Sequence, residues 1–145
     1  MAYKHFEAIE KHAGLLGVLI AGQPSLIDMS DISEVLSPQT LVPVPMAKPW
    51  VKGVSNVRGN LYCVTDIAAY LGLGAASGAL DNRLLLVAER HAFNAALLVD
   101  KVLGLRDARD WAIEAAGLRY EQGMLWRKLD IGNLLSQTEF LQIGA

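Results

Sequence analysis

Short apolar segments separated by turn residues are the feature that most constrains the fold of this chain. About eight to ten segments of strand length recur at roughly regular spacing, and only brief stretches favour a helix. Evenly spaced short strands are typical of all-β barrels and sandwiches, whereas a parallel α/β sheet needs long helices between its strands. We therefore predict an all-β fold with short helices.

The clearest of these segments runs from Leu61 to Ile67 and follows the pair Gly59-Asn60, which favours a tight turn. Apolar residues occupy both faces of the segment, so we expect a well-buried strand. Asp66 is placed to cap a short helix after this strand. A similar pattern of Asp-Ile, two residues, an apolar residue and Leu returns at Asp130. It indicates either two similar β units or a coincidence of common residues.

Composition excludes several classes of protein. The 145 residues are 52% hydrophobic and 19% charged, with a net charge of −2, which argues against disorder and against a nucleic-acid partner. No apolar run approaches the roughly 18 residues of a membrane-spanning helix, and the charged N-terminus does not resemble a signal peptide. We expect a cytoplasmic protein without direct membrane insertion. The apolar excess fits either an ordinary core or surface reserved for partners.

Residues that could carry chemistry do not assemble into a known pattern. Cys63, Asp66 and His91 are the candidates for a nucleophilic triad, but Asp66 lies three positions after Cys63, which places the two on opposite faces of a strand. The histidines lack metal-ligand spacing. The glycines at 72 and 74 are not followed by the lysine or threonine of a phosphate-binding loop. We predict no enzymatic activity, no metal and no cofactor.

Three polar residues stand out in apolar surroundings. Arg58 lies beside the expected turn, Asn56 precedes it, and Glu34 is isolated between Ser33 and Val35. Most arginines and glutamates are simply solvated surface charges. The functional alternative is a charged pair on an apolar recognition face, where arginine often anchors an interface.

The run from Val44 to Ile67 resembles the signature of the CheW-like adaptor family of bacterial chemotaxis. That signature is Val-Pro, a small loop, an aromatic residue, Gly-Val-x-Asn-Leu-Arg-Gly, a hydrophobic strand and Asp-Leu. Here it reads Val44-Pro45, Trp50, Gly53-Val-Ser-Asn-Val-Arg-Gly59 and Asp66-Ile67. The resemblance divides the chain into an N-terminal extension (1–14), a CheW-like domain (15–137) and a C-terminal tail (138–145).

The resemblance implies a fold of two small five-stranded SH3-like β-barrels packed together, and a non-enzymatic role in signal transduction. Such adaptors couple methyl-accepting chemoreceptors to a CheA-like histidine kinase. The implied partners are therefore the cytoplasmic tip of a receptor and the regulatory domain of the kinase, and the implied location is the cytoplasm beside membrane receptor arrays. The surface that meets the kinase is not assigned.

By position in the motif, the resemblance implies a receptor-binding groove in which Arg58 pairs with an acidic residue. The groove residues are Ile32, Glu34, Gly53, Asn56 and Arg58. The short segment before Met124 and the aromatic Trp126 resemble the branch of the family that serves type IV pilus twitching motility. The alternatives are an adaptor for flagellar chemotaxis and a small-ligand-binding β-barrel domain, which would hold a polar-lined cavity between strands.

Overall fold

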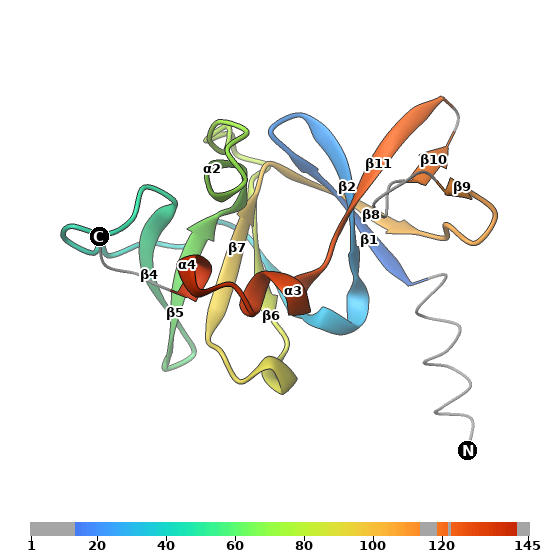
Figure 1. The fold of residues 1–145 in the computed structure, drawn as a ribbon. Helices are drawn as coiled ribbons and strands as arrows, with labels where there is room; N and C mark the ends of the chain where they lie inside the picture. The colour runs from blue at the N-terminus through green and yellow to red at the C-terminus, as the bar shows by residue number, and fades with distance from the viewer. Residues whose placement is uncertain (1–13, 114–118, 122, 142–145) are drawn as a thin grey trace, which may run out of the picture.

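The computed structural model of the chain describes residues 14–113, 119–121 and 123–141. Strands dominate this part of the chain, as the spacing of apolar segments predicts (Figure 1). The strands are β1 Leu15–Ile20, β2 Gln23–Asp28, β3 Ile32–Leu36, β4 Val51–Val57, β5 Asn60–Asp66, β6 Arg83–Val87, β7 Ala95–Val99, β8 Lys101–Arg106, β9 Ala112–Ile113, β10 Arg119–Glu121 and β11 Met124–Leu129.

The helices are short, and two of them begin where the sequence predicts. They are α2 Ile67–Tyr70, α3 Ile131–Leu135 and α4 Thr138–Leu141, with 3-10 turns η1 Met29–Asp31 and η2 Glu89–His91. Asp66 Oδ1 accepts the Ala69 N–H at 3.3 Å, and Asp130 Oδ1 accepts the Asn133 N–H at 3.1 Å. Each carboxylate satisfies an amide that has no partner within its helix. The Asp-Ile repeat therefore has a structural counterpart.

The described residues form two sheets, and these lie side by side in Figure 1. One sheet has the order β8-β1-β2-β11-β10-β9 and the other has the order β3-β6-β7-β5-β4. The strand before each capped helix pairs in parallel, β5 with β7 and β11 with β2. The predicted two-part β architecture is confirmed. The first sheet contains six strands rather than five because the two-residue β9 adds to its edge.

The largest core cluster joins the two sheets. Side chains from β1 of the first sheet, such as Val18, pack with side chains from β6 and β7 of the second, such as Leu85 and Leu97. All three are fully buried. Smaller clusters lie within each sheet, one around Leu84 and Leu86 and one around Trp126. The hydrophobic residues thus fill one core between the sheets and a thinner one inside each.

The structure describes part of the expected C-terminal tail and only residue 14 of the expected N-terminal extension. Residues 1–13 of the expected N-terminal extension lie outside the described residues. In the expected tail, residues 138–141 form α4, and Phe140 is buried in the largest cluster. Tyr70 on α2 meets Phe140 edge-on, with ring centroids 5.1 Å apart. This part of the tail therefore packs on the domain.

Candidate functional site: an ion pair between two sheet edges

The turn between β4 and β5 presents Arg58. Val57 pairs with Asn60, which leaves Arg58 and Gly59 as the two turn residues, with φ of +51° and +87°. Positive φ at both central positions is the geometry of a type I′ turn, which matches the right-handed twist of the flanking strands. The predicted pair Gly59-Asn60 is therefore wrong by one residue. Arginine rarely adopts this conformation, so the turn holds Arg58 in a sparsely populated state.

Asn56 and Gly53 shape the strand that leads to this turn. Asn56 Oδ1 accepts the Gly59 N–H at 2.9 Å, so its side chain braces the turn. Gly53 has φ +143°, and a Cβ there would lie 2.6 Å from the carbonyl oxygen of Val42. Only glycine lets the Val42 backbone approach β4 this closely. Both motif residues thus have a structural task beside Arg58.

Strand β3 places Glu34 on the face that looks toward Arg58. Ile32 pairs with Val87 and Glu34 pairs with Leu86, and the register shifts between them. Residues i and i+2 of a regular strand share a face, so the bulge separates Ile32 from Glu34. Ile32 is 7% exposed and belongs to the core between the sheets, where a partner meets it only if its neighbours move.

Arg58 and Glu34 form a bidentate ion pair. Nη2 of Arg58 lies 2.6 Å from Oε1 of Glu34, and Nη1 lies 3.0 Å from Oε2. The side chains are 67% and 34% exposed. The hydrogen bonds from Arg58 lower the pKa of Glu34, and those to Glu34 raise the pKa of Arg58. The two residues predicted to pair are paired, with both charged groups facing solvent.

The ion pair joins the two edges of the five-stranded sheet. Strands β3 and β4 are its outermost members, so the sheet must curl to bring Glu34 and Arg58 together. The chain that connects them also bridges the gap: the Val42 N–H donates to the Val54 carbonyl at 2.9 Å, and the Val54 N–H donates to the Val42 carbonyl at 2.8 Å. We call this gap between β3 and β4 the seam. Gly53 permits the bridge, and Arg58 spans the seam with Glu34.

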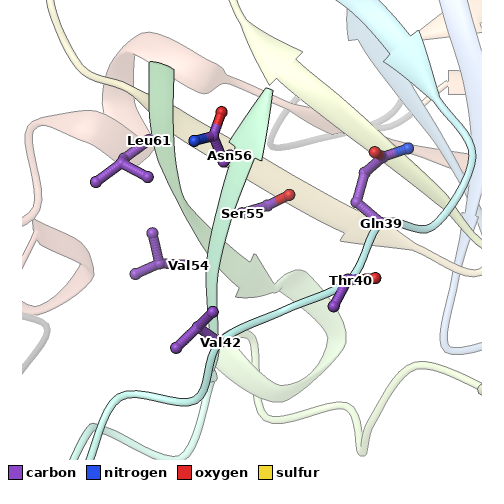
Figure 2. A pocket seen from close by; sticks show the side chains of 7 residues that line it. All are labelled: Gln39, Thr40, Val42, Val54, Ser55, Asn56 and Leu61. Atoms are coloured by element: carbon purple, nitrogen blue, oxygen red, sulfur yellow. The ribbon is translucent and has the colours of Figure 1, made fainter. Parts of the chain in front are cut away.

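A surface hollow of about 650 Å³ opens beside β4 (Figure 2). It adjoins the turn through Asn56, and Figure 2 shows Gln39 and Thr40 on the connecting chain across from β4. The lining mixes polar and apolar side chains: Gln39, Thr40, Val42, Val54, Ser55, Asn56 and Leu61. Leu61 and Val42 are 60% and 66% exposed. Sequence reasoning did not identify either of these two exposed residues as part of a site.

The residues considered for catalysis serve other purposes. Asp66 is buried and caps α2, and its second oxygen accepts the Ala76 N–H at 2.9 Å. Burial raises the pKa of the half-buried Cys63 thiol, which keeps it in the unreactive form. His91 contacts Asp31 rather than Cys63. Within the described ranges, no group of three metal-ligating side chains occurs.

Among the described residues, no helix is both long enough and apolar enough to cross a membrane.

Comparison with known proteins identifies the family of the chain. A family model described as the CheW-like domain matches residues 14–138. The chain belongs to the CheW-like domain family. Protein PilI from Pseudomonas aeruginosa is 34% identical over 100 residues, which cover 69% of this chain and 55% of that protein. Chemotaxis protein CheW from Thermotoga maritima is 30% identical over 104 residues, which cover 72% of this chain and 63% of that protein.

The predicted resemblance to the CheW-like family is therefore confirmed, and PilI is among the proteins to which the chain is similar. The crystal structure of the scaffolding protein TtCheW from Thermoanaerobacter tengcongensis has the same fold, with a TM-score of 0.69 and 18% sequence identity. The alignment covers 83% of this chain and 91% of that one. The matches to PilI and CheW span less than two thirds of either relative.

Proposed function

We propose that this CheW-like chain is a non-enzymatic adaptor that couples methyl-accepting chemoreceptors to a CheA-like histidine kinase. The observation that carries the proposal is the exposed, bidentate ion pair between Arg58 and Glu34 on a CheW-like domain. Both charged groups face solvent, so they are accessible to a partner. The scaffolding and chemotaxis relatives support a coupling role.

The proposed mechanism is that of a scaffold. The cytoplasmic tip of the receptor docks as an amphipathic helix beside the ion pair, and the regulatory domain of the kinase occupies another surface. Charges at the rim of an interface orient a partner and discourage wrong partners more than they add affinity. Arg58 and Glu34 therefore set the orientation of the receptor, while Asn56 and Gly53 keep Arg58 in place.

The test is binding of a purified receptor tip to the adaptor, measured by pull-down or calorimetry. Arg58→Ala weakens the association while the circular dichroism spectrum stays that of the wild type. Arg109→Ala is the matched control. Arg109 also forms an exposed ion pair, with Asp107, and both residues follow β8 of the six-stranded sheet. Undiminished binding by a folded Arg58→Ala variant contradicts the proposal.

We also propose that the pathway is type IV pilus twitching motility, on the strength of the similarity to PilI. The similarity to CheW supports flagellar chemotaxis as the second candidate. Deletion of the gene separates the two. Loss of twitching zones with intact swimming chemotaxis supports the pilus pathway, and the opposite phenotype supports the flagellar pathway.

The kinase and the location are tested together in cells. The adaptor is proposed to be cytoplasmic and recruited to receptor arrays, so a fluorescent fusion should form foci where the receptors are present. Affinity purification of the native protein should recover both a receptor and a histidine kinase. A diffuse fusion, with neither partner recovered, contradicts the proposal.

Small-ligand binding is the second function that an observation favours. The hollow beside β4 has a mixed lining, and the buried Ser55 hydroxyl on it has no hydrogen-bond partner among the described residues. Native mass spectrometry of the protein purified from its own cells decides between the two. A bound small molecule favours the ligand-binding function, and an unmodified mass favours the adaptor.

A further inference from the structure

A cluster of charged side chains fixes the start of β3. Asp31 is 9% exposed, and its Oδ1 accepts hydrogen bonds from Arg90 and from His91, the latter at 2.8 Å. A carboxylate only accepts, so Nε2 of His91 carries the proton. Arg90 also donates to the hydroxyl of Ser30 at 3.2 Å. Both donors lie in η2, which connects β6 to β7. The cluster therefore links the start of β3 to the connection between β6 and β7.

The backbone of Asp31 is tied to the same region. Its carbonyl accepts the Ala88 N–H at 2.8 Å, which continues the register in which Ile32 pairs with Val87. Beyond the bulge, Glu34 pairs with Leu86 in a register shifted by one residue. The cluster therefore holds the first of the two registers immediately before the strand changes to the second.

This arrangement decides which way Glu34 points. Without the bulge, Ile32 and Glu34 would lie on the same face of β3. If the register that pairs Ile32 with Val87 continued unchanged, Glu34 would lie opposite Leu85. Leu85 belongs to the core between the sheets, whereas Leu86 belongs to the core inside the five-stranded sheet. A strand with a single register could not bury Ile32 in one core and present Glu34 to Arg58.

We propose that Asp31 is a positioning residue for the partner-binding ion pair: its contacts with Arg90 and His91 pin β3 so that Glu34 stays on the face of Arg58. The proposal rests on the proposed function only for the statement that the ion pair binds a partner. The effect of Asp31 on the position of Glu34 depends on the geometry of β3 alone. The strand is an edge strand, bonded on one side only to β6, and its register with β6 shifts between Ile32 and Glu34.

The test is the titration of Glu34 in the folded protein, followed by carboxyl carbon chemical shifts. In the wild type, Arg58 keeps the pKa of Glu34 below its usual value. In Asp31→Ala, the pKa of Glu34 should rise toward its ordinary value, because a displaced Glu34 loses its hydrogen bonds from Arg58. Simple removal of the Asp31 charge would have the opposite effect, because a nearby negative charge raises the pKa of a carboxyl group. The direction of the change therefore distinguishes lost positioning from a lost charge.

Three further variants complete the test. Asp31→Glu keeps an acceptor for Arg90 and His91 and should restore the low pKa of Glu34. Asp107→Ala removes the carboxylate of a separate exposed ion pair and should leave Glu34 unchanged. If Asp31→Ala does not fold, Asp31→Ser shortens the side chain, so that it no longer reaches Arg90 and His91, and should move the pKa of Glu34 in the same upward direction.

An unchanged or lowered Glu34 pKa in a folded Asp31→Ala or Asp31→Ser variant overturns the positioning role. No partner is present in this experiment, so its outcome is independent of receptor binding. A raised Glu34 pKa combined with unaltered receptor binding by Arg58→Ala would support the positioning role and contradict the proposed function.

Discussion

Substitution of Gly53 by alanine tests the construction of the seam. The backbone of Gly53 has φ +143°, a conformation that side-chain-bearing residues rarely adopt. Its missing Cβ would lie 2.6 Å from the carbonyl oxygen and 3.1 Å from the carbonyl carbon of Val42. Because these are backbone atoms, no side-chain rotation relieves the contact. The chain at Val42 must move away from β4.

The structure sets the size of the effect. Holding alanine at this φ costs about 1–3 kcal/mol. Moving Val42 breaks both hydrogen bonds of its bridge to Val54, each of which is worth about 1 kcal/mol net. The free energy of unfolding should therefore fall by about 3–5 kcal/mol, a large share of the roughly 5–15 kcal/mol of a typical domain.

Urea denaturation measures this loss, with Gly22→Ala as the matched control. Gly22 also has a positive φ, +79°, but a Cβ there meets no atom within 4 Å. The control carries the conformational strain alone, about 1–2 kcal/mol. Hydrogen exchange at the Val42 and Val54 amides should quicken only in Gly53→Ala. Equal losses in the two variants, with both amides still protected, would refute the reasoning.

The other predictions concern Asp66 and Cys63. Asp66→Ala removes a helix cap and leaves the Ala76 N–H without its acceptor, so unfolding free energy should fall by about 2–4 kcal/mol in the same urea assay. Asp130→Ala removes only the corresponding exposed cap and should cost about 1 kcal/mol. Equal losses would mean that the second contact of Asp66 contributes nothing. Burial raises the pKa of the Cys63 thiol, so iodoacetamide at pH 8 should alkylate it more slowly in the folded protein than in urea. Equal rates would contradict that burial.

Local features of the fold were predictable because neighbouring residues determine them. A segment with apolar residues on both faces indicated β5, and the carboxylates of Asp66 and Asp130 indicated the starts of α2 and α3. The predicted turn was one residue too late. The pair Gly59-Asn60 favours a turn by its composition, but the residues with positive φ are Arg58 and Gly59. Turn rules favour asparagine or glycine there, and no local rule selects arginine.

Features that depend on distant contacts were not predictable. The bulge in β3 arises because Ile32 must fill the core between the sheets while Glu34 meets Arg58, which is 24 residues away. The register that achieves both is fixed by contacts of Asp31 with η2, almost 60 residues further along. The residues alone left a charged pair as one of two alternatives, and the family motif implied that Arg58 pairs with an acidic residue, because no spacing rule connects two opposite edges of a sheet.

The most direct test of the central claim is a charge-swap cycle on the ion pair, with binding of the receptor tip as the readout. Arg58→Glu and Glu34→Arg each place like charges side by side and should each weaken binding. The double variant restores opposite charges and should recover part of the lost affinity, because the two residues are in contact and their effects are not additive. Losses that simply add in the double variant, or single variants that bind like the wild type, would contradict the claim that this pair orients the receptor.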